Sequence, residues 1–390
     1  MKRSTLICIT LSALLALTLS ACSVRMEPDF IFGETEPPPT EEARVSPSPT
    51  TVVVTAIPAT ELPAYTTRAP SASPEATPDP ASPTPEAAAF ADPAFEQAVA
   101  EACGITGPVT REFAEDLQEL SLSGFGLTDI GDITLFPSLL KLDISDNAIT
   151  DLTPLAQLPV LVSLDIHGDP VEDISPLADC ALLNELDIGG TSVTDLTPLA
   201  SLQGLEYLRL YETQVADITP LSGLTQLKSL DLFRCTLIED MTPIASLTGL
   251  VGIDLGETGV NDISFLSGLN ELVFADLYGN GIDDISALAG HTALERLWLG
   301  SNCIEDISVL ADMTELTELQ LSSNLISDVA PLERLTKLTT LLLDKNLIEE
   351  VSPLMGLEEI EQLSICENPV NSEELEQVKE NFAQRAELYY

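Results

Sequence analysis

Leucine and isoleucine recur along most of this chain with a constant period of 22 residues. The period runs through twelve units, with a single step of 23 residues between the sixth unit and the seventh. The units begin at Leu117, Leu139, Leu161, Leu183, Leu205, Leu227, Leu250, Leu272, Leu294, Leu316, Leu338 and Ile360. Each unit reads LxxLxLxxNxIxDIxxLxxLxx, and a fixed period of this length predicts a solenoid in which every repeat stacks on the one before it.

Within a unit, residues 4 and 6 are apolar and flank a polar residue. This alternation predicts a short strand with one buried face. Residue 9 is most often Asn, whose amide can hydrogen-bond backbone groups of the neighbouring coil. This position holds Asn147, Asn280, Asn302, Asn324, Asn346 and Asn368, with Thr191, Thr213, Thr258 and Cys235 as weaker substitutes.

Residue 13 is acidic in most units and precedes the sequence Ile-x-Pro-Leu. An acidic residue before a proline-containing turn predicts the N-cap of a 3₁₀ turn. The column consists of Asp129, Asp151, Asp173, Asp195, Asp217, Asp262, Asp284, Asp306, Asp328 and Glu350. Calcium binding is an alternative use of such a column, but capping accounts for every member, so we expect no metal site.

These motifs resemble the 22-residue leucine-rich repeats of the internalin family and related bacterial surface proteins. The resemblance covers residues 117–370. It implies an α/β solenoid, a right-handed leucine-rich-repeat horseshoe with a parallel strand ladder on its concave face and 3₁₀ turns on its convex face. It also implies that the concave face binds a protein. The chain departs from the family in showing neither a C-terminal immunoglobulin-like domain nor a Leu-Pro-x-Thr-Gly sorting signal.

A solenoid needs polar caps, because its end repeats would otherwise expose apolar core and strand edges. We expect a helical N-cap over residues 89–116. Asp92 and Pro93 start its first helix, which ends at Gly104, and Thr110 starts its second. The residues expected to point inward are Phe95, Val99, Ala102 and Phe113.

The C-terminal cap is expected to be helical over residues 371–390. Asn371 and Glu374 form a pair that is similar to a capping box at the start of this helix. The apolar residues of one helical face are Leu375, Val378 and Phe382.

The first 88 residues differ in composition from the repeats. Residues 1–21 combine a positive start with a short apolar stretch, which predicts an export signal. The sequence Leu-Ser-Ala-Cys that ends at Cys22 resembles a bacterial lipobox, which implies lipidation of Cys22 and anchoring at the outer face of the cell membrane. The segment 22–88 is rich in Pro, Thr and Ser and predicts a disordered tether.

The charge of the chain restricts its partners. The formal net charge is −47, and it becomes −49 when the two basic residues of segment 1–21 are removed with it. Such a field repels nucleic acid and anionic lipid head groups and favours basic protein partners. Contact with the membrane is therefore expected through the lipid alone.

The sequence contains no arrangement typical of an enzyme or of a cofactor site. It has two histidines and no glycine-rich phosphate loop. His167 is residue 7 of the third repeat and is expected to be a solvated surface residue, although Asp143, Asp165 and Asp187 lie near it. His291 is expected to be partly buried on the convex side. We therefore expect no catalytic residue, no cofactor and no metal.

Five cysteines follow Cys22. They are Cys103, Cys180, Cys235, Cys303 and Cys366. The last three lie in repeats six, nine and twelve, so neighbours among them are about 14 Å apart at a strand spacing of about 4.8 Å. A disulfide needs Cα atoms within about 7 Å. The spacing therefore predicts five free thiols.

Residues 3, 5, 7 and 8 of each repeat are expected to face the concave side, and their chemistry changes along the array. Repeats five to nine supply aromatic and arginine side chains, which dominate binding hot spots. These candidate ligand-binding residues are Tyr207, Arg209, Tyr211, Phe233, Arg234, Phe274, Tyr278, Arg296 and Trp298. Beside them an acidic row consists of Asp143, Asp165, Asp187, Asp231, Asp254 and Asp276. Aromatic residues also suit strands for structural reasons alone.

The leading hypothesis is a surface-anchored module that binds a protein, in adhesion or in contact with a host or neighbouring cell. The alternative is a structural or glycan-binding protein of the cell envelope. A purely structural role predicts an unremarkable strand face, whereas a glycan-binding role predicts paired aromatic residues beside carboxylates and amides.

Overall fold

The structure is a computed structural model, and it describes residues 86–382 and 386–390. The expected signal peptide, Cys22 and nearly all of the expected tether lie outside the described residues. Within them, thirteen strands form one parallel sheet in which each strand pairs with the next along the chain. Eleven 3₁₀ turns alternate with the strands. The predicted leucine-rich-repeat solenoid is therefore confirmed.

The strands are three residues long, and the first twelve occupy residues 3–5 of their repeats, whereas β13 lies after the last repeat. They are β1 (Glu119–Ser121), β2 (Lys141–Asp143), β3 (Ser163–Asp165), β4 (Glu185–Asp187), β5 (Tyr207–Arg209), β6 (Ser229–Asp231), β7 (Gly252–Asp254), β8 (Phe274–Asp276), β9 (Arg296–Trp298), β10 (Glu318–Gln320), β11 (Thr340–Leu342), β12 (Gln362–Ser364) and β13 (Glu387–Tyr389).

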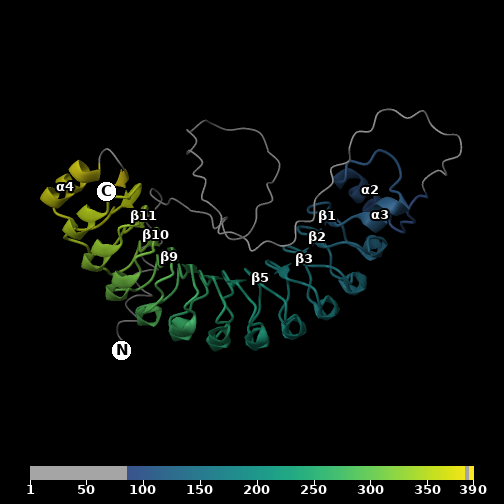
Figure 1. The fold of residues 1–390 in the computed structure, drawn as a ribbon, viewed down its shortest axis with the longest axis horizontal. Coiled ribbons are helices and arrows are strands. Elements are labelled where there is room, and N and C mark those ends of the chain that lie inside the picture. The colour runs from purple at the N-terminus through teal and green to yellow at the C-terminus, as the bar shows by residue number, and fades with distance from the viewer. Residues whose placement is uncertain (1–85, 383–385) are drawn as a thin grey trace. The chain divides into compact units, whose positions relative to one another are not determined.

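The 3₁₀ turns lie on the opposite side of each repeat. They are η1 (Gly131–Leu135), η2 (Thr153–Gln157), η3 (Ser175–Asp179), η4 (Thr197–Ser201), η5 (Thr219–Gly223), η6 (Thr242–Ser246), η7 (Ser264–Gly268), η8 (Ser286–Leu288), η9 (Ser308–Asp312), η10 (Ala330–Arg334) and η11 (Ser352–Gly356). Figure 1 shows the strands along the inner side of an arc and these turns along its outer side. Because a helical turn is wider than a strand, the outer side is longer and the stack curves.

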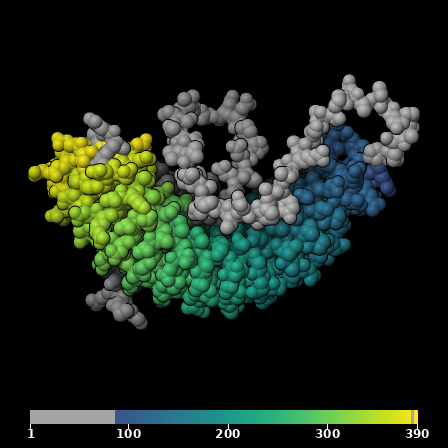
Figure 2. Space-filling view, in the orientation of Figure 1, coloured from purple at the N-terminus to yellow at the C-terminus, as the bar shows by residue number. Residues whose placement is uncertain are grey.

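The apolar positions of the repeat fill one continuous core between the two sides. In the tenth repeat, residues 1, 4, 6, 11, 14, 17 and 20 are all 1% exposed or less, and they are Leu316, Leu319, Leu321, Ile326, Val329, Leu332 and Leu335. The space-filling view shows the repeats as one unbroken curved body (Figure 2). Stacking thus buries side chains that a single repeat could not cover.

Asparagine at residue 9 joins neighbouring repeats, as predicted. Asn324 donates to the carbonyl oxygens of Leu299 and Leu321, both at 2.9 Å, and its Oδ1 accepts from the N–H of Ile304 at 3.1 Å. Thr191 makes only the bond to its own repeat, to the carbonyl oxygen of Ile188. The Asn side chain therefore satisfies three backbone groups that the curved chain leaves unpaired.

The nine aspartates at residue 13 each cap the 3₁₀ turn from one position earlier than predicted, whereas Glu350 makes no such bond to η11 among the described contacts. The Asp151 Oδ1 accepts from the N–H of Thr153, the first residue of η2, at 2.8 Å. Leu152 occupies the N-cap position itself and makes no capping bond through its side chain. In the sixth repeat, which holds the extra residue, Asp240 makes the same bond to Thr242.

The N-terminal cap consists of α2 (Pro93–Ala102) and α3 (Arg111–Asp116), capped by Asp92 and Thr110 as predicted. The inward face of α2 differs in one residue, since Ala98 is buried and Ala102 is exposed. Ala87, at the end of the expected tether, forms a β-bridge with Thr110.

The C-terminal cap is only partly helical, which corrects the prediction. The helix α4 (Ser372–Phe382) buries Val378 and Phe382. After it the chain adds β13, and Leu388 pairs with Leu363 of β12. A thirteenth strand satisfies backbone groups along the edge of β12 that a helix would leave unpaired.

The start of α4 also departs from the expected capping box. The Asn371 Oδ1 accepts from the N–H of Glu374, as predicted. The Glu374 carboxylate accepts from the N–H of Val351 instead of reaching back to the start of its own helix. Glu374 therefore ties the cap to the eleventh repeat.

Candidate ligand-binding face

The predicted acidic row exists as a continuous line across seven strands. Each of its members is residue 5 of its repeat, and neighbours lie in register from β2 to β8. Arg209 of β5 occupies the one non-acidic position inside the row. Because residues 4 and 6 point into the core, the side chains of residue 5 point to the opposite face of the ladder, which is the concave side of the solenoid. Figure 1 shows the strands along this inner side.

Each aspartate of the row has a local structural role that its position in the sequence did not reveal. Its Oδ1 accepts from the N–H of residue 7, two positions further on. Asp254 bonds Gly256 in this way at 2.8 Å, and Asp276 bonds Tyr278 at 2.8 Å. This bond holds the chain as it leaves the strand for residue 8, which has a positive φ in all twelve repeats. It occupies only one of the two carboxylate oxygens.

The middle of the row consists of buried carboxyl groups. Asp187, Asp231, Asp254 and Asp276 are each 5–8% exposed. Burial raises the pKa of each of the four carboxyl groups above its usual range, and a neighbouring aspartate raises it further. Asp187 forms an ion pair with Arg209 at 3.2 Å. The other three form no ion pair with a basic side chain of the described residues.

The candidate arginines are engaged within the chain. Arg209 pairs with Asp187. Arg234, in the turn after β6, bridges Glu212 and Glu257 with two contacts of 2.8 Å. Arg296 lies over the ring of Phe274, with its Cζ 4.9 Å from the ring centroid. These arginines therefore organise the face more than they offer free positive charge to a ligand.

The candidate aromatic residues fall into two groups. Phe274 and Trp298 form an edge-to-face pair with centroids 5.2 Å apart and are only 5% and 8% exposed. The second group is partly exposed and consists of Tyr207, Tyr211, Phe233 and Tyr278. Glycines make room for some of these rings, because a Cβ at Gly189 would overlap Tyr211 and a Cβ at Gly256 would lie 2.9 Å from Phe233. The exposed group is the better candidate for contact with a ligand.

His167 lies in a cluster of carboxylates, so its expected role as a solvated residue is wrong. Its Nδ1 is 2.8 Å from Asp165 Oδ1, and its Nε2 is 3.5 Å from Asp146 Oδ2. The hydrogen bond to Asp165 raises the pKa of His167 to about 9, against a smaller effect of burial. One ligand atom each from Asp165, His167 and Asp187 lie within 4.8 Å of one another, as a metal site would require. The bonds to Asp165 and Arg209 already occupy part of this set.

His291 is fully buried, whereas the sequence predicts partial burial. Its two ring nitrogens lie 3.0 and 3.1 Å from the carbonyl oxygens of Leu288 and Leu266. The residue replaces a core leucine and joins two repeats through its ring. It lies on the turn side of the coil, away from the concave face.

The cysteines follow the prediction from their spacing except at one position. Cys103, Cys180 and Cys235 carry free thiols. Burial raises the pKa of Cys180 to about 11, so its thiol is unreactive at neutral pH. Cys303 is disulfide-bonded, so the prediction of five free thiols is wrong there. The spacing of the strands excludes a disulfide only between two cysteines that both lie in the repeats.

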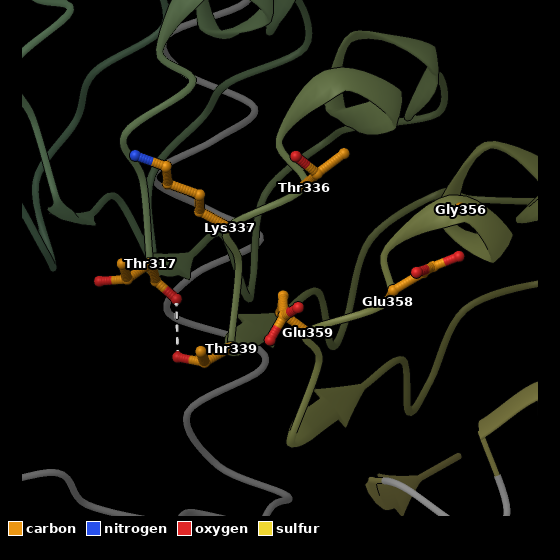
Figure 3. Close-up of a pocket in the computed structure, with 7 residues that line it drawn as sticks. All are labelled: Thr317, Thr336, Lys337, Thr339, Gly356, Glu358 and Glu359. Atoms are coloured by element: carbon orange, nitrogen blue, oxygen red, sulfur yellow. Dashed lines mark hydrogen bonds between the residues drawn. The ribbon is translucent and has the colours of Figure 1, made fainter.

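A depression of about 650 Å³ lies outside the concave face (Figure 3). It is lined by Thr317, Thr336, Lys337, Thr339, Gly356, Glu358 and Glu359. Gly356 is the last residue of η11, and the other residues belong to the segments that lead from the 3₁₀ turns back to the strands. Figure 3 shows the Thr339 hydroxyl donating to the carbonyl oxygen of Thr317, at 3.1 Å. None of the predicted ligand-binding residues contributes to it.

One further ionisable residue was missed. Asp169 takes the asparagine position of the third repeat, is 1% exposed, and accepts from the N–H of Ile149 through Oδ1. Its buried Oδ2 has no hydrogen-bond partner. Desolvation raises the pKa of Asp169 to about 6. Aligning residue 9 of every repeat would have found it.

Comparison with known proteins gives a consistent result. The family described as "Leucine Rich repeats (2 copies)" matches residues 137–179, 203–246 and 292–334. No curated protein matches the chain. A crystal structure of the internalin InlF from Listeria monocytogenes is 32% identical, with 77% of this chain and 88% of that chain covered and a TM-score of 0.71.

More distant structures share the fold. A leucine-rich-repeat protein of Leptospira interrogans is 18% identical, with 72% of this chain and 85% of that chain covered and a TM-score of 0.55. The plant peptide hormone receptor RGFR1, in complex with RGF2, is 21% identical over 66% of this chain and 45% of that chain, with a TM-score of 0.52.

The described residues contain no helix of the length and apolarity that a membrane crossing requires.

Proposed function

Because the chain belongs to the internalin family of leucine-rich-repeat proteins, we propose that it is a surface-anchored module that binds a protein ligand on the concave face of repeats five to nine. The lipid on Cys22 would hold it at the outer face of the bacterial cell membrane. The fold supports an interaction module, and the proposal assigns it no chemistry of its own.

The distribution of side chains on the ladder supports this location. Tyr207, Tyr211, Phe233 and Tyr278 are partly exposed within four consecutive repeats. They stand beside the buried carboxylates of the acidic row. Large rings next to fixed charges combine apolar area with polar anchoring, which is the composition of binding hot spots.

A site-specific photocrosslinker tests this proposal whatever the identity of the ligand. Benzoylphenylalanine replaces Phe233 in one variant of the full-length chain and Leu347, which is 52% exposed, in a control variant. Irradiation with whole cells or envelope extracts should yield a defined protein adduct at residue 233 and none at residue 347. Adducts with polysaccharide alone would support the envelope-binding alternative, and equal adducts at both positions would contradict the proposed face.

Once a ligand is identified, its affinity for variants provides a second measure. We expect Tyr211→Ala to weaken binding by about 2 kcal/mol. Trp298→Ala should also weaken binding, but it removes a buried ring from the pair with Phe274 and should lower stability as well. Unchanged affinity in Tyr211→Ala and Tyr278→Ala together would place the site elsewhere.

A further inference from the structure

Three adjacent strands carry a row of buried carboxyl groups that form no ion pair with the basic side chains of residues 86–382 and 386–390. Asp231, Asp254 and Asp276 lie in register on β6, β7 and β8. Each is more than nine-tenths buried and accepts one N–H bond through Oδ1. Among the described residues, no Lys, Arg or His forms an ion pair with any of them. Buried carboxylates without a counter-ion carry a large desolvation cost, which a cationic ligand would offset.

In the middle strand, glycines flank the aspartate on the concave face. Residues 3 and 7 of the seventh repeat are Gly252 and Gly256, so Asp254 is the only side chain that β7 presents to the concave face. The Phe233 ring lies against the residues that follow this strand, since a Cβ at Gly256 would lie 2.9 Å from the ring. Tyr278 occupies the same position of the eighth repeat, but its ring lies toward the ninth repeat, where a Cβ at Gly300 would be 3.1 Å from it. Phe233 is therefore the aromatic residue that lies beside the middle of the carboxylate row.

The chain shows within itself how such a group of side chains holds a cation. The guanidinium of Arg234 bridges Glu212 and Glu257, which lie two repeats apart, at 2.8 Å on each side. It also lies over the ring of Phe233, with its Cζ 4.8 Å from the centroid. Asp231 and Asp276 have the same two-repeat separation. A planar guanidinium can stack on a ring while donating to two carboxylates, which an ammonium group cannot do.

We infer that Asp231, Asp254 and Asp276 form a slot for one guanidinium group, the side chain of an arginine on the protein ligand. This inference rests on the proposed function and names the chemistry that the concave face recognises. Phe233 is the aromatic residue beside the slot.

The surrounding charges make proton release a signature of this slot. Burial and the neighbouring carboxylates raise the pKa of all three groups, with Asp187 and Glu257 adding to the repulsion and Arg209 opposing it at Asp231. At neutral pH the row therefore retains protons. A bound guanidinium favours the ionised forms, so binding should release protons to the buffer.

The experiment uses the full-length chain in detergent and three probes: tetra-arginine, tetra-lysine and tetra-citrulline peptides. Titration calorimetry at pH 7 in buffers of different ionisation enthalpy gives both affinity and proton release. The test variant carries Asp231→Asn, Asp254→Asn and Asp276→Asn, and each amide keeps the oxygen that accepts the backbone N–H. The matched control carries Glu239→Gln, Glu271→Gln and Glu305→Gln, which replace the same number of carboxyl groups by amides at three exposed positions off the concave face.

We expect tetra-arginine to bind with release of protons and more tightly than tetra-lysine, and tetra-citrulline not to bind. The test variant should lose at least about tenfold in affinity together with the proton release, whereas the control should lose less than about threefold. If the triple variant does not fold, the single variant Asp254→Asn replaces it in the test. This variant should show a smaller loss of affinity and of proton release. Equal losses in the test and control variants, no proton release, or equal binding of tetra-lysine would overturn the inference. A protein crosslinked at residue 233 whose binding survives the test variant would refute the slot and leave the proposed function standing.

Discussion

The ring of Tyr211 lies against the backbone of Gly189, one repeat earlier, so closely that a Cβ at Gly189 would overlap it. The two residues occupy position 7 of the fifth and fourth repeats. The glycine therefore determines where the tyrosine ring lies, next to the buried pair of Asp187 and Arg209. A residue that carries no side chain thus shapes the proposed ligand-binding face.

Gly189→Ala should displace the Tyr211 ring and destabilise the protein by about 1–3 kcal/mol, because a closely packed ring has to move. Gly223→Ala is the matched control, since its nearest neighbour would be an ordinary 3.8 Å away. Urea denaturation measures both. The double variant Gly189→Ala/Tyr211→Ala should show less than the sum of the two single losses, and simple additivity would mean that the ring is not the cause.

The protonated form of His167 should stabilise the folded state. Its pKa is raised to about 9 by the hydrogen bond to Asp165. A raised pKa means that this stabilisation is complete below the unfolded value of about 6.5 and is lost as the pH rises through 9. An NMR titration of the imidazole ring should show Asp165→Asn lowering the pKa by more than about one unit, whereas Asp143→Asn changes it little. A wild-type value near 6.5 would contradict the hydrogen-bonded cluster.

Asp169→Asn should stabilise the protein above pH 6. The ionised carboxylate has a buried oxygen without a partner, and an amide there could donate to the backbone carbonyl groups as the other asparagines of the column do. The expected gain at pH 8 is about 1–3 kcal/mol.

The gain from Asp169→Asn should shrink as the pH falls, because the raised pKa of about 6 lets the folded state bind a proton at this carboxyl. Urea melts at pH 8 and pH 5 measure the difference. The reverse variant Asn324→Asp should lose stability most at pH 8. A gain that does not change with pH would show that the charge is not responsible.

The proposed anchor depends on Cys22. Cys22→Ala should give protein that no longer partitions into the detergent phase as a lipoprotein, since two acyl chains supply most of the membrane affinity. Phase separation with Triton X-114 measures this, and Cys8→Ala is a control within the segment that should be cleaved. Unchanged partitioning of the Cys22 variant would exclude the lipid anchor.

The sequence alone determined the architecture, because each leucine of the repeat has one role wherever it recurs. The 22-residue period predicted the strands, the turns, the buried columns and the asparagine bonds between repeats. It also placed Asp231, Asp254 and Asp276 in one row, since a parallel ladder brings equal repeat positions side by side. In a repeat protein, the position of a residue within its repeat therefore also predicts which residues of the neighbouring repeats it contacts.

Tertiary structure decided everything that depends on one side chain meeting another of a different kind. Three contacts of this kind join repeats that differ from one another, so the 22-residue period does not predict them. They are Arg234 between Glu212 and Glu257, Tyr211 against Gly189, and His167 among carboxylates. The strand β13 was missed for the same reason, because a strand outside the repeat is recognised only by the edge that it covers. Burial was likewise decided in three dimensions, since neighbouring repeats close over carboxylates that the sequence alone would leave in solvent.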